Sequence, residues 1–191
     1  MRKLLMLAVA LTVFSFMSVD AAIARGPERL VDQDDYKEGD FVKGIIEDYT
    51  DMLEGDGVEW LWVAPGVKLS DYKIKIGEFK NMSEVTNKDM IEALEDGFDD
   101  AFQRLGKKGG SAGSLSTENA VYWAERAQAA KRWIPYAGGH LAQSGVGIEM
   151  VFRDSNGKII AKMRHSGRQG EKLEEAAEEL VDDIANYIAE H

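Results

Sequence analysis

Residues 143–165 read QSGVGIEMVFRDSNGKIIAKMRH and hold the clearest structural pattern in the chain. The segments 143–153 and 158–165 are rich in strand-forming side chains, and Asp154–Gly157 between them includes an Asn-Gly pair. Asn and Gly readily adopt the positive φ values that a tight hairpin turn requires. The sequence therefore predicts an antiparallel hairpin, around which the rest of a sheet can form.

Two more strands are expected upstream of this hairpin. In VEWLWVA (58–64) the two tryptophans share one face and the following Leu and Val share the other, because side chains alternate along a strand. A strand that is apolar on both faces is usually covered on both sides. In YKIKIGEF (72–79) apolar residues alternate with lysines, which predicts a half-buried strand with its lysines outward.

Helices are predicted from apolar residues at three- and four-residue spacing. Residues 88–105 follow Thr86 and Asn87, either of which can cap a helix, and residues 171–189 have the same pattern. Residues 41–53 are also expected to form an amphipathic helix or a pair of helical turns. The segment 116–134 fits both a helix and a strand, although its alanines favour the helix.

The order of these elements predicts the fold class. Helices that follow groups of strands are typical of an α/β (α+β) domain. We expect one such domain over residues 41–191, with a mixed, largely antiparallel sheet of about five strands and helices packed on it.

The first residues are typical of a secretory signal. Arg2 and Lys3 precede an apolar run at 4–17, and an Ala-Ile-Ala site follows at 22–24. The run is shorter than the ~20 apolar residues of a spanning helix. We expect cleavage after Ala24, a mobile leader over 25–40, and a location in the periplasm, with full secretion as the alternative.

Composition narrows the classes of partner. The chain has 23 basic and 34 acidic residues, a formal net charge of −11, and no cysteine. Nucleic acid is disfavoured, since phosphate binding depends on clustered Lys and Arg. The missing cysteine excludes disulfides, thiolate metal sites and the usual lipidated cysteine of a bacterial lipoprotein. We therefore expect no lipid anchor and no transmembrane segment after cleavage, while oligomeric state is left open.

Two stretches resemble exported bacterial proteins. Residues 41–79, marked by Asp48-Tyr49, Pro65-Gly66 and Tyr72, resemble an opening shared by envelope proteins of unknown function. Residues 129–167, in which a basic-aromatic-glycine turn leads into the hairpin, resemble the core of domain of unknown function 4410. The resemblance implies an envelope protein with an α/β fold, and it implies that 120–128 is a strand. It implies no chemistry.

The best candidate for a binding surface is the turn over residues 132–140. Aromatic and Arg side chains are enriched at protein interfaces, and paired glycines let another backbone approach closely. A structural crossover whose aromatics fill the core is the alternative interpretation. The candidate binding residues are Arg132, Trp133, Tyr136, Gly138, Gly139 and His140.

Catalytic and metal sites have weaker support. His140 and His165 could line a cleft, but the chain has no GxSxG or HExxH motif around a nucleophile or zinc. Residues 32–35 begin like a calcium loop without the expected Gly and Glu at its sixth and twelfth positions. Trp60 and Trp62 could stack on sugars, although such a pair is more often core. We predict no cofactor and no metal.

The sequence thus favours a non-catalytic periplasmic protein that binds another cell-envelope component, through the 132–140 turn or an exposed sheet edge. The alternative is a small-ligand-binding or hydrolytic protein with a cleft near His140 and His165.

Overall fold

The computed structural model describes residues 30–37, 41–107, 110–128 and 142–191. Its elements in chain order are α1 (Gln33–Lys37), β1 (Leu53–Glu54), β2 (Trp60–Val63), the short 3-10 helix η1 (Leu69–Asp71), β3 (Tyr72–Lys75), β4 (Phe79–Asn81), α2 (Lys88–Gly106), β5 (Gly113–Glu125), β6 (Ser144–Arg153), β7 (Ile159–Gln169) and α4 (Leu173–Glu190).

The strands form one mixed sheet, as the sequence predicts. Its order is β1-β2-β7-β6-β5-β3, and β4 also pairs with β5. Neighbours from β1 to β5 are antiparallel, while β3 and β4 run parallel to β5. The described residues contain seven strands rather than about five. The increase comes from the short β1 and from a break in the predicted strand 72–79.

The break lies at Gly77, between β3 and β4. The N–H of Gly77 donates to the Thr117 hydroxyl at 3.0 Å, and its carbonyl accepts from the Asn119 amide at 2.7 Å. A Cβ at this position would lie 2.2 Å from the Thr117 carbonyl oxygen. Only glycine therefore lets the chain approach β5 this closely, and the ladder is interrupted here.

The predicted hairpin is confirmed by β6 and β7. The N–H of Gly157 donates to the Asp154 carbonyl at 2.9 Å, and the N–H of Asp154 donates to the Lys158 carbonyl at 3.0 Å. Gly157 has a φ of 80°, the positive value that the Asn-Gly pair predicts. Pairing continues beyond the expected end, from Ile148–His165 to Ser144–Gln169.

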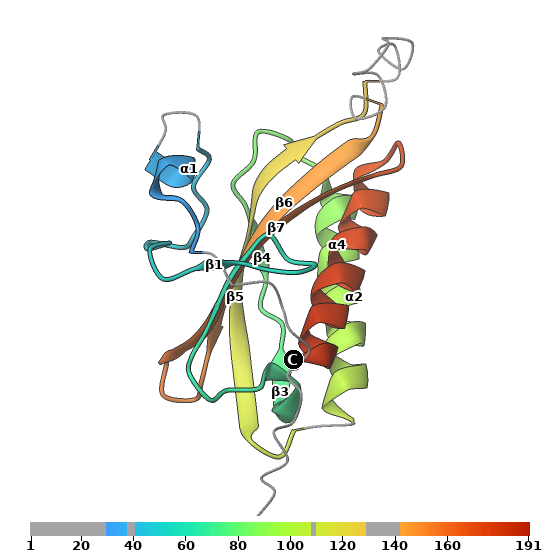
Figure 1. Cartoon of the computed structure of the whole chain (residues 1–191). Coiled ribbons are helices and arrows are strands. Elements are labelled where there is room, and N and C mark those ends of the chain that lie inside the picture. The colour runs from blue at the N-terminus through green and yellow to red at the C-terminus, as the bar shows by residue number, and fades with distance from the viewer. Residues whose placement is uncertain (1–29, 38–40, 108–109, 129–141) are drawn as a thin grey trace, which may run out of the picture.

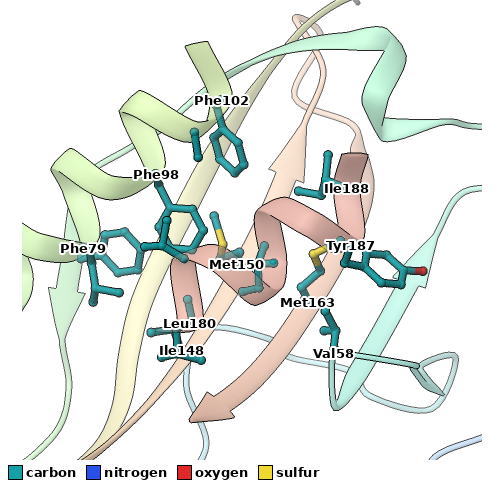
Figure 2. Packing of buried hydrophobic residues seen from close by; sticks show 14 of the residues in the cluster. Val58, Phe79, Phe98, Phe102, Ile148, Met150, Met163, Leu180, Tyr187 and Ile188 are labelled. Atoms are coloured by element: carbon teal, nitrogen blue, oxygen red, sulfur yellow. The ribbon is translucent and has the colours of Figure 1, made fainter. Parts of the chain in front are cut away.

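Both predicted long helices are confirmed, and they cover one face of the sheet (Figure 1). Asn87 caps α2, because its side chain accepts the N–H of Met90 at 2.9 Å. Figure 2 shows the core between helices and sheet, where Phe98, Met150 and Leu180 are each fully buried. This core is the main hydrophobic cluster of the domain.

The segment 116–134 is described as far as Gln128, and β5 occupies it to Glu125. Its alanine content favours a helix, but Ala120, Val121 and Tyr122 are all buried in consecutive positions. Such a run is covered on both faces of a central strand, and this burial outweighs helix propensity. The strand that the resemblance implies over 120–128 is therefore found from 120 to 125, and 126–128 lie beyond its end.

The opposite face of the sheet is covered by residues 30–37 and 41–52, so β2 is enclosed on both sides as predicted. Val31, Tyr36 and Tyr49 are buried there in a second cluster, against which Trp60 and Trp62 pack. The two tryptophans therefore belong to this packing, as the core interpretation of the pair expects. The leader differs from its prediction within 30–37, where α1 forms and packs on the domain.

The predicted helix over residues 41–53 is wrong. Residues 41–52, here called the strap, contain neither helix nor strand. Part of their main chain bonds to side chains of the sheet: the N–H of Ile46 donates to Glu149 at 2.8 Å, and the carbonyl of Val42 accepts from Arg164 at 3.0 Å. Within the strap, the N–H of Met52 donates to the Tyr49 carbonyl at 3.0 Å. The apolar spacing reported burial correctly, but it could not show which groups satisfy the backbone.

Candidate functional site

The six residues predicted to form the binding turn lie within 129–141, outside the described residues. The structure does describe both roots of this turn, residues 125–128 and 142–144. Ser144 joins them, because its hydroxyl accepts the N–H of Ala127 at 3.1 Å and donates to the Glu171 carbonyl at 2.9 Å. The roots are therefore fixed at the end of the sheet where α4 begins.

A hollow of about 800 Å³ lies beside these roots. It is lined by the starts of both long helices and by the first root, including Asn87, Asp89, Arg126, Lys172, Glu174 and Glu178. Carboxylates at a helix start complement its positive end. Glu175 accepts the N–H of Glu171 at 2.9 Å, and Glu174 approaches the Asn87 amide at 3.5 Å. Several acidic side chains around this hollow therefore bind groups at the N-terminal ends of the two helices.

The strand side of the roots is rigid. Arg168 donates to Glu125 at 2.6 Å, and its guanidinium lies 4.6 Å from the centre of the Trp123 ring. The Trp123 ring covers Gly145 so closely that a Cβ there would lie 2.4 Å from it. The ion pair and the cation–π contact thus join the end of β5 to β7, and the close packing of Trp123 on Gly145 joins β5 to β6.

His165 is a structural residue in this arrangement. It is 8% exposed, its Nδ1 accepts the N–H of Glu59 at 3.3 Å, and its Nε2 lies 3.1 Å from Asp183 Oδ2. Because Nδ1 faces a donor, we assign the ring proton to Nε2, which then donates to Asp183. Neither nitrogen is left to act as a base. His140 lies outside the described residues, so the predicted histidine cleft retains no described catalytic member.

The most heavily buried polar group was missed by the sequence interpretation. Glu149 is fully buried and pairs with Arg164, which is 6% exposed. Glu149 also accepts the hydroxyl of Tyr49 at 2.7 Å. The Glu149 carboxylate inside the apolar stretch of β6 was the available signal. The position of Glu149 and Arg164 on the face opposite the helices shows that they hold the strap.

Aromatic rings surround this ion pair. The Arg164 guanidinium lies 3.5 Å from the centre of the Tyr122 ring and 4.3 Å from that of Phe41. Burial raises the pKa of Tyr122 to about 12. Burial and the neighbouring Glu149 charge raise the pKa of Tyr49 well above its ordinary value. Both phenols therefore stay neutral, and the side chains around the Glu149–Arg164 ion pair hold the strap against the sheet.

Among the described residues, no group of three or more His, Asp or Glu side chains is placed to hold a metal ion. In residues 32–35, which begin like a calcium loop, Asp32 accepts the N–H of Asp34 at 3.0 Å, an ordinary local turn. Across these same ranges, no helix is both long and apolar enough to cross a bilayer.

Comparisons with known proteins give a fold likeness at low similarity. No family model and no curated protein matches the chain, so the resemblance to domain of unknown function 4410 stays an expectation. Two dodecamer structures of PelC from Paraburkholderia phytofirmans are 13% and 14% identical, with TM-scores of 0.44 and 0.46. They cover 67% of this chain and 93% and 94% of their own.

A third structure, described as a "putative lipoprotein" from Caulobacter crescentus, is 14% identical, with a TM-score of 0.31. The match covers 64% of this chain and 91% of the other. At these values none of the three structures carries an argument about function.

Proposed function

We propose that this chain is an exported, non-catalytic protein that binds another component of the cell envelope through the 132–140 turn. The observation that carries the proposal is the way the turn is mounted. Its roots are fixed by Ser144 and by the Arg168–Glu125 pair, next to an open hollow at one end of the domain. A rigid scaffold that presents a loop is a common arrangement for binding surfaces.

The composition of the turn fits this role. It carries Arg132, Trp133 and Tyr136, the three residue types that most often dominate binding energy at protein interfaces. The paired glycines allow close approach of a partner's backbone. The hydrolytic alternative is weaker, because both ring nitrogens of His165 are already engaged.

Export is the second part of the proposal, and it rests on the signal at residues 1–24. Its test is the mass of the protein recovered from the periplasm, which should correspond to a chain that begins at Arg25. A chain that retains its first residues and sediments with membranes would contradict cleavage after Ala24.

Binding is tested by affinity capture of the mature chain from periplasm and solubilised envelope, followed by mass spectrometry. We expect a reproducible partner that the double variant Trp133→Ala/Tyr136→Ala captures at least tenfold less. A matched control removes exposed apolar surface elsewhere, through Val42→Ala/Met82→Ala, since these side chains are 46% and 50% exposed. Equal capture by all three proteins, each with an unchanged melting temperature, would remove the turn from the proposal.

A further inference from the structure

Cations on the strands of the sheet include two groups with different surroundings. The first lies along β7, where each of three cations faces a carboxylate. Lys162 pairs with Asp51, Arg164 with Glu149, and Arg168 with Glu125. These three cations are therefore already paired with carboxylates of the same molecule.

The second group lies on β3. Tyr72 and Ile74 pack against the core below the helices. Lys73 and Lys75 alternate with them along the strand, and the Lys73 stem passes beside Gly106, in the last turn of α2, and beside Gly110. Both lysines are exposed, and within the described ranges neither forms an ion pair. In a chain with a net charge of −11, β3 thus carries two available positive charges.

The main chain beside these lysines is also available. β3 is the last strand of the sheet, with β5 as its only neighbour among the described strands. Over the described residues, no main-chain hydrogen bond joins Lys73–Lys75 to anything outside that pairing.

The neighbouring stretch is closed by contrast. There, Thr117 and Asn119 hold both polar groups of the Gly77 backbone, and Glu95 accepts the N–H of Phe79 at 2.9 Å. The edge is therefore closed at Gly77 and Phe79, next to the open main chain of β3.

We propose that the edge of β3 binds an extended acidic segment of a partner protein as an added strand. Strand addition supplies main-chain hydrogen bonds, and side chains at alternate positions give specificity. Alternate residues on one strand face are about 6.6–6.8 Å apart, so carboxylates at every second position of the partner match Lys73 and Lys75. This site is separate from the turn, and it shares with the proposed function only the premise that the chain is a binding protein.

Charge argues against the other occupants. A second copy that paired edge to edge through β3 would place lysines opposite lysines, which is destabilising. Anionic polymers without a peptide backbone meet the repulsion of the whole acidic molecule and gain no strand hydrogen bonds. An acidic strand gains both the ion pairs and the ladder.

The test uses the ¹⁵N-labelled mature chain with two synthetic peptides, acetyl-TETETET-amide and acetyl-TKTKTKT-amide. We expect the acidic peptide to shift the amide resonances of Lys73–Lys75 and to slow their hydrogen exchange at least tenfold, and the basic peptide to do neither. Lys73→Glu/Lys75→Glu should reverse this preference. The control Lys88→Glu/Lys158→Glu makes the same change of charge at exposed lysines away from β3 and should behave as wild type.

The outcomes separate this proposal from the previous one. Trp133→Ala/Tyr136→Ala should bind the acidic peptide normally, even if capture of the envelope partner is lost. No protection by either peptide, or equal protection by both, would overturn the inference and leave the lysines as guards against unwanted edge pairing. Protection that depends on protein concentration without peptide would also overturn it, in favour of self-association.

Discussion

The cations of β7 and those of β3 lie on strands of one sheet, yet their surroundings are opposite. Lys162 and Arg164 are 8% and 6% exposed beneath the strap, and each is fixed by a carboxylate and a main-chain carbonyl. The side chains of Lys73 and Lys75 are exposed and form no ion pair within the described residues. The comparison shows that position on a strand does not set the role of a charge; the segment that covers it does.

The physical reason is desolvation. A charge removed from water must be compensated by partners, and the loss of one partner leaves an uncompensated buried charge. An exposed charge keeps its water, so its removal changes stability little. Substitutions on β7 should therefore affect folding, whereas those on β3 should affect only what binds there.

The largest effect is expected from Glu149→Ala. This change leaves the Arg164 guanidinium buried without its counter-charge, and it also removes the acceptor of the Tyr49 hydroxyl and the Ile46 N–H. Loss of one partner of a buried pair costs about 3–5 kcal/mol. Urea unfolding of the purified mature chain measures the change.

An exposed pair provides the control for that measurement. Glu118 pairs with Arg153 at 2.9 Å, and the two side chains are 54% and 36% exposed. Glu118→Ala should cost less than about 1 kcal/mol. Glu149→Met/Arg164→Met removes both buried charges and should recover much of the lost stability. Equal costs for the two single variants would show that burial under the strap is not what distinguishes the β7 pair.

A smaller loss is expected where the strap approaches the ion pair most closely. A Cβ at Gly44 would lie 2.3 Å from Glu149 Oε2, so Gly44→Ala must displace the carboxylate or the strap. Overpacking of this kind typically costs about 1–3 kcal/mol. Thermal unfolding, followed by circular dichroism, gives the change in free energy.

Gly106→Ala is the matched substitution near β3. Its Cβ would meet only the Lys73 side chain, at an ordinary 3.7 Å, and the residue lies in the last turn of α2. Alanine should be neutral there or slightly stabilising, since glycine is the weaker helix former. If Gly44→Ala were as well tolerated as Gly106→Ala, the strap would not be held as closely as the geometry requires.

The fold could be predicted from sequence where local pattern and tertiary burial agree. The β6–β7 hairpin has strand formers and turn residues in the right places, and α2 has both an apolar stripe and the Asn87 cap. The pattern failed where they disagree. In the strap, helical spacing arose from residues buried by an irregular chain. In β5, Ala120 lies in a stretch that is buried on both faces of the sheet.

The candidate sites show the same limit. Glu149 could be recognised as unusual inside the apolar stretch of β6, but only the register that brings β6 beside β7 shows that it pairs with Arg164. His165 looked available because its partners, Glu59 and Asp183, come from distant parts of the chain. The turn residues 132–140 lie outside the described ranges, and their role stays a prediction.

A third pair of substitutions compares one lysine of β7 with one lysine of β3. Lys162 donates to the Asp48 carbonyl at 2.8 Å and pairs with Asp51. Lys162→Met therefore removes two contacts that hold the strap to β7. Net hydrogen bonds of this kind contribute about 0.5–1.5 kcal/mol each, and we expect a loss of about 1–2 kcal/mol by urea unfolding. Lys75→Met should stay within about 0.5 kcal/mol of wild type, as at ordinary surface positions. A Lys75 variant as unstable as the Lys162 variant would show that this β3 lysine also stabilises the fold.

The smallest expected effect on stability appears only at alkaline pH, and it comes from the phenol groups beside the Glu149–Arg164 ion pair. The pKa of Tyr49 is raised in the folded protein by burial and by the Glu149 charge. The folded state therefore keeps the phenol proton after the unfolded chain has lost it, above about pH 10. Stability then falls as pH rises, because the native state binds more protons than the unfolded state. For one such tyrosine the loss reaches about 0.8 kcal/mol at pH 10.5.

Tyr49→Phe removes this group while it keeps the ring. Urea unfolding between pH 9 and 11 should show a shallower decline for the variant than for wild type, in addition to a constant cost from the missing 2.7 Å hydrogen bond to Glu149. Tyr72→Phe is the control, since that half-buried residue lies on β3, away from the Glu149–Arg164 ion pair. Identical slopes for wild type and Tyr49→Phe would mean that the strap opens in alkali before the phenol ionises, and that β7 is no better shielded from water than β3.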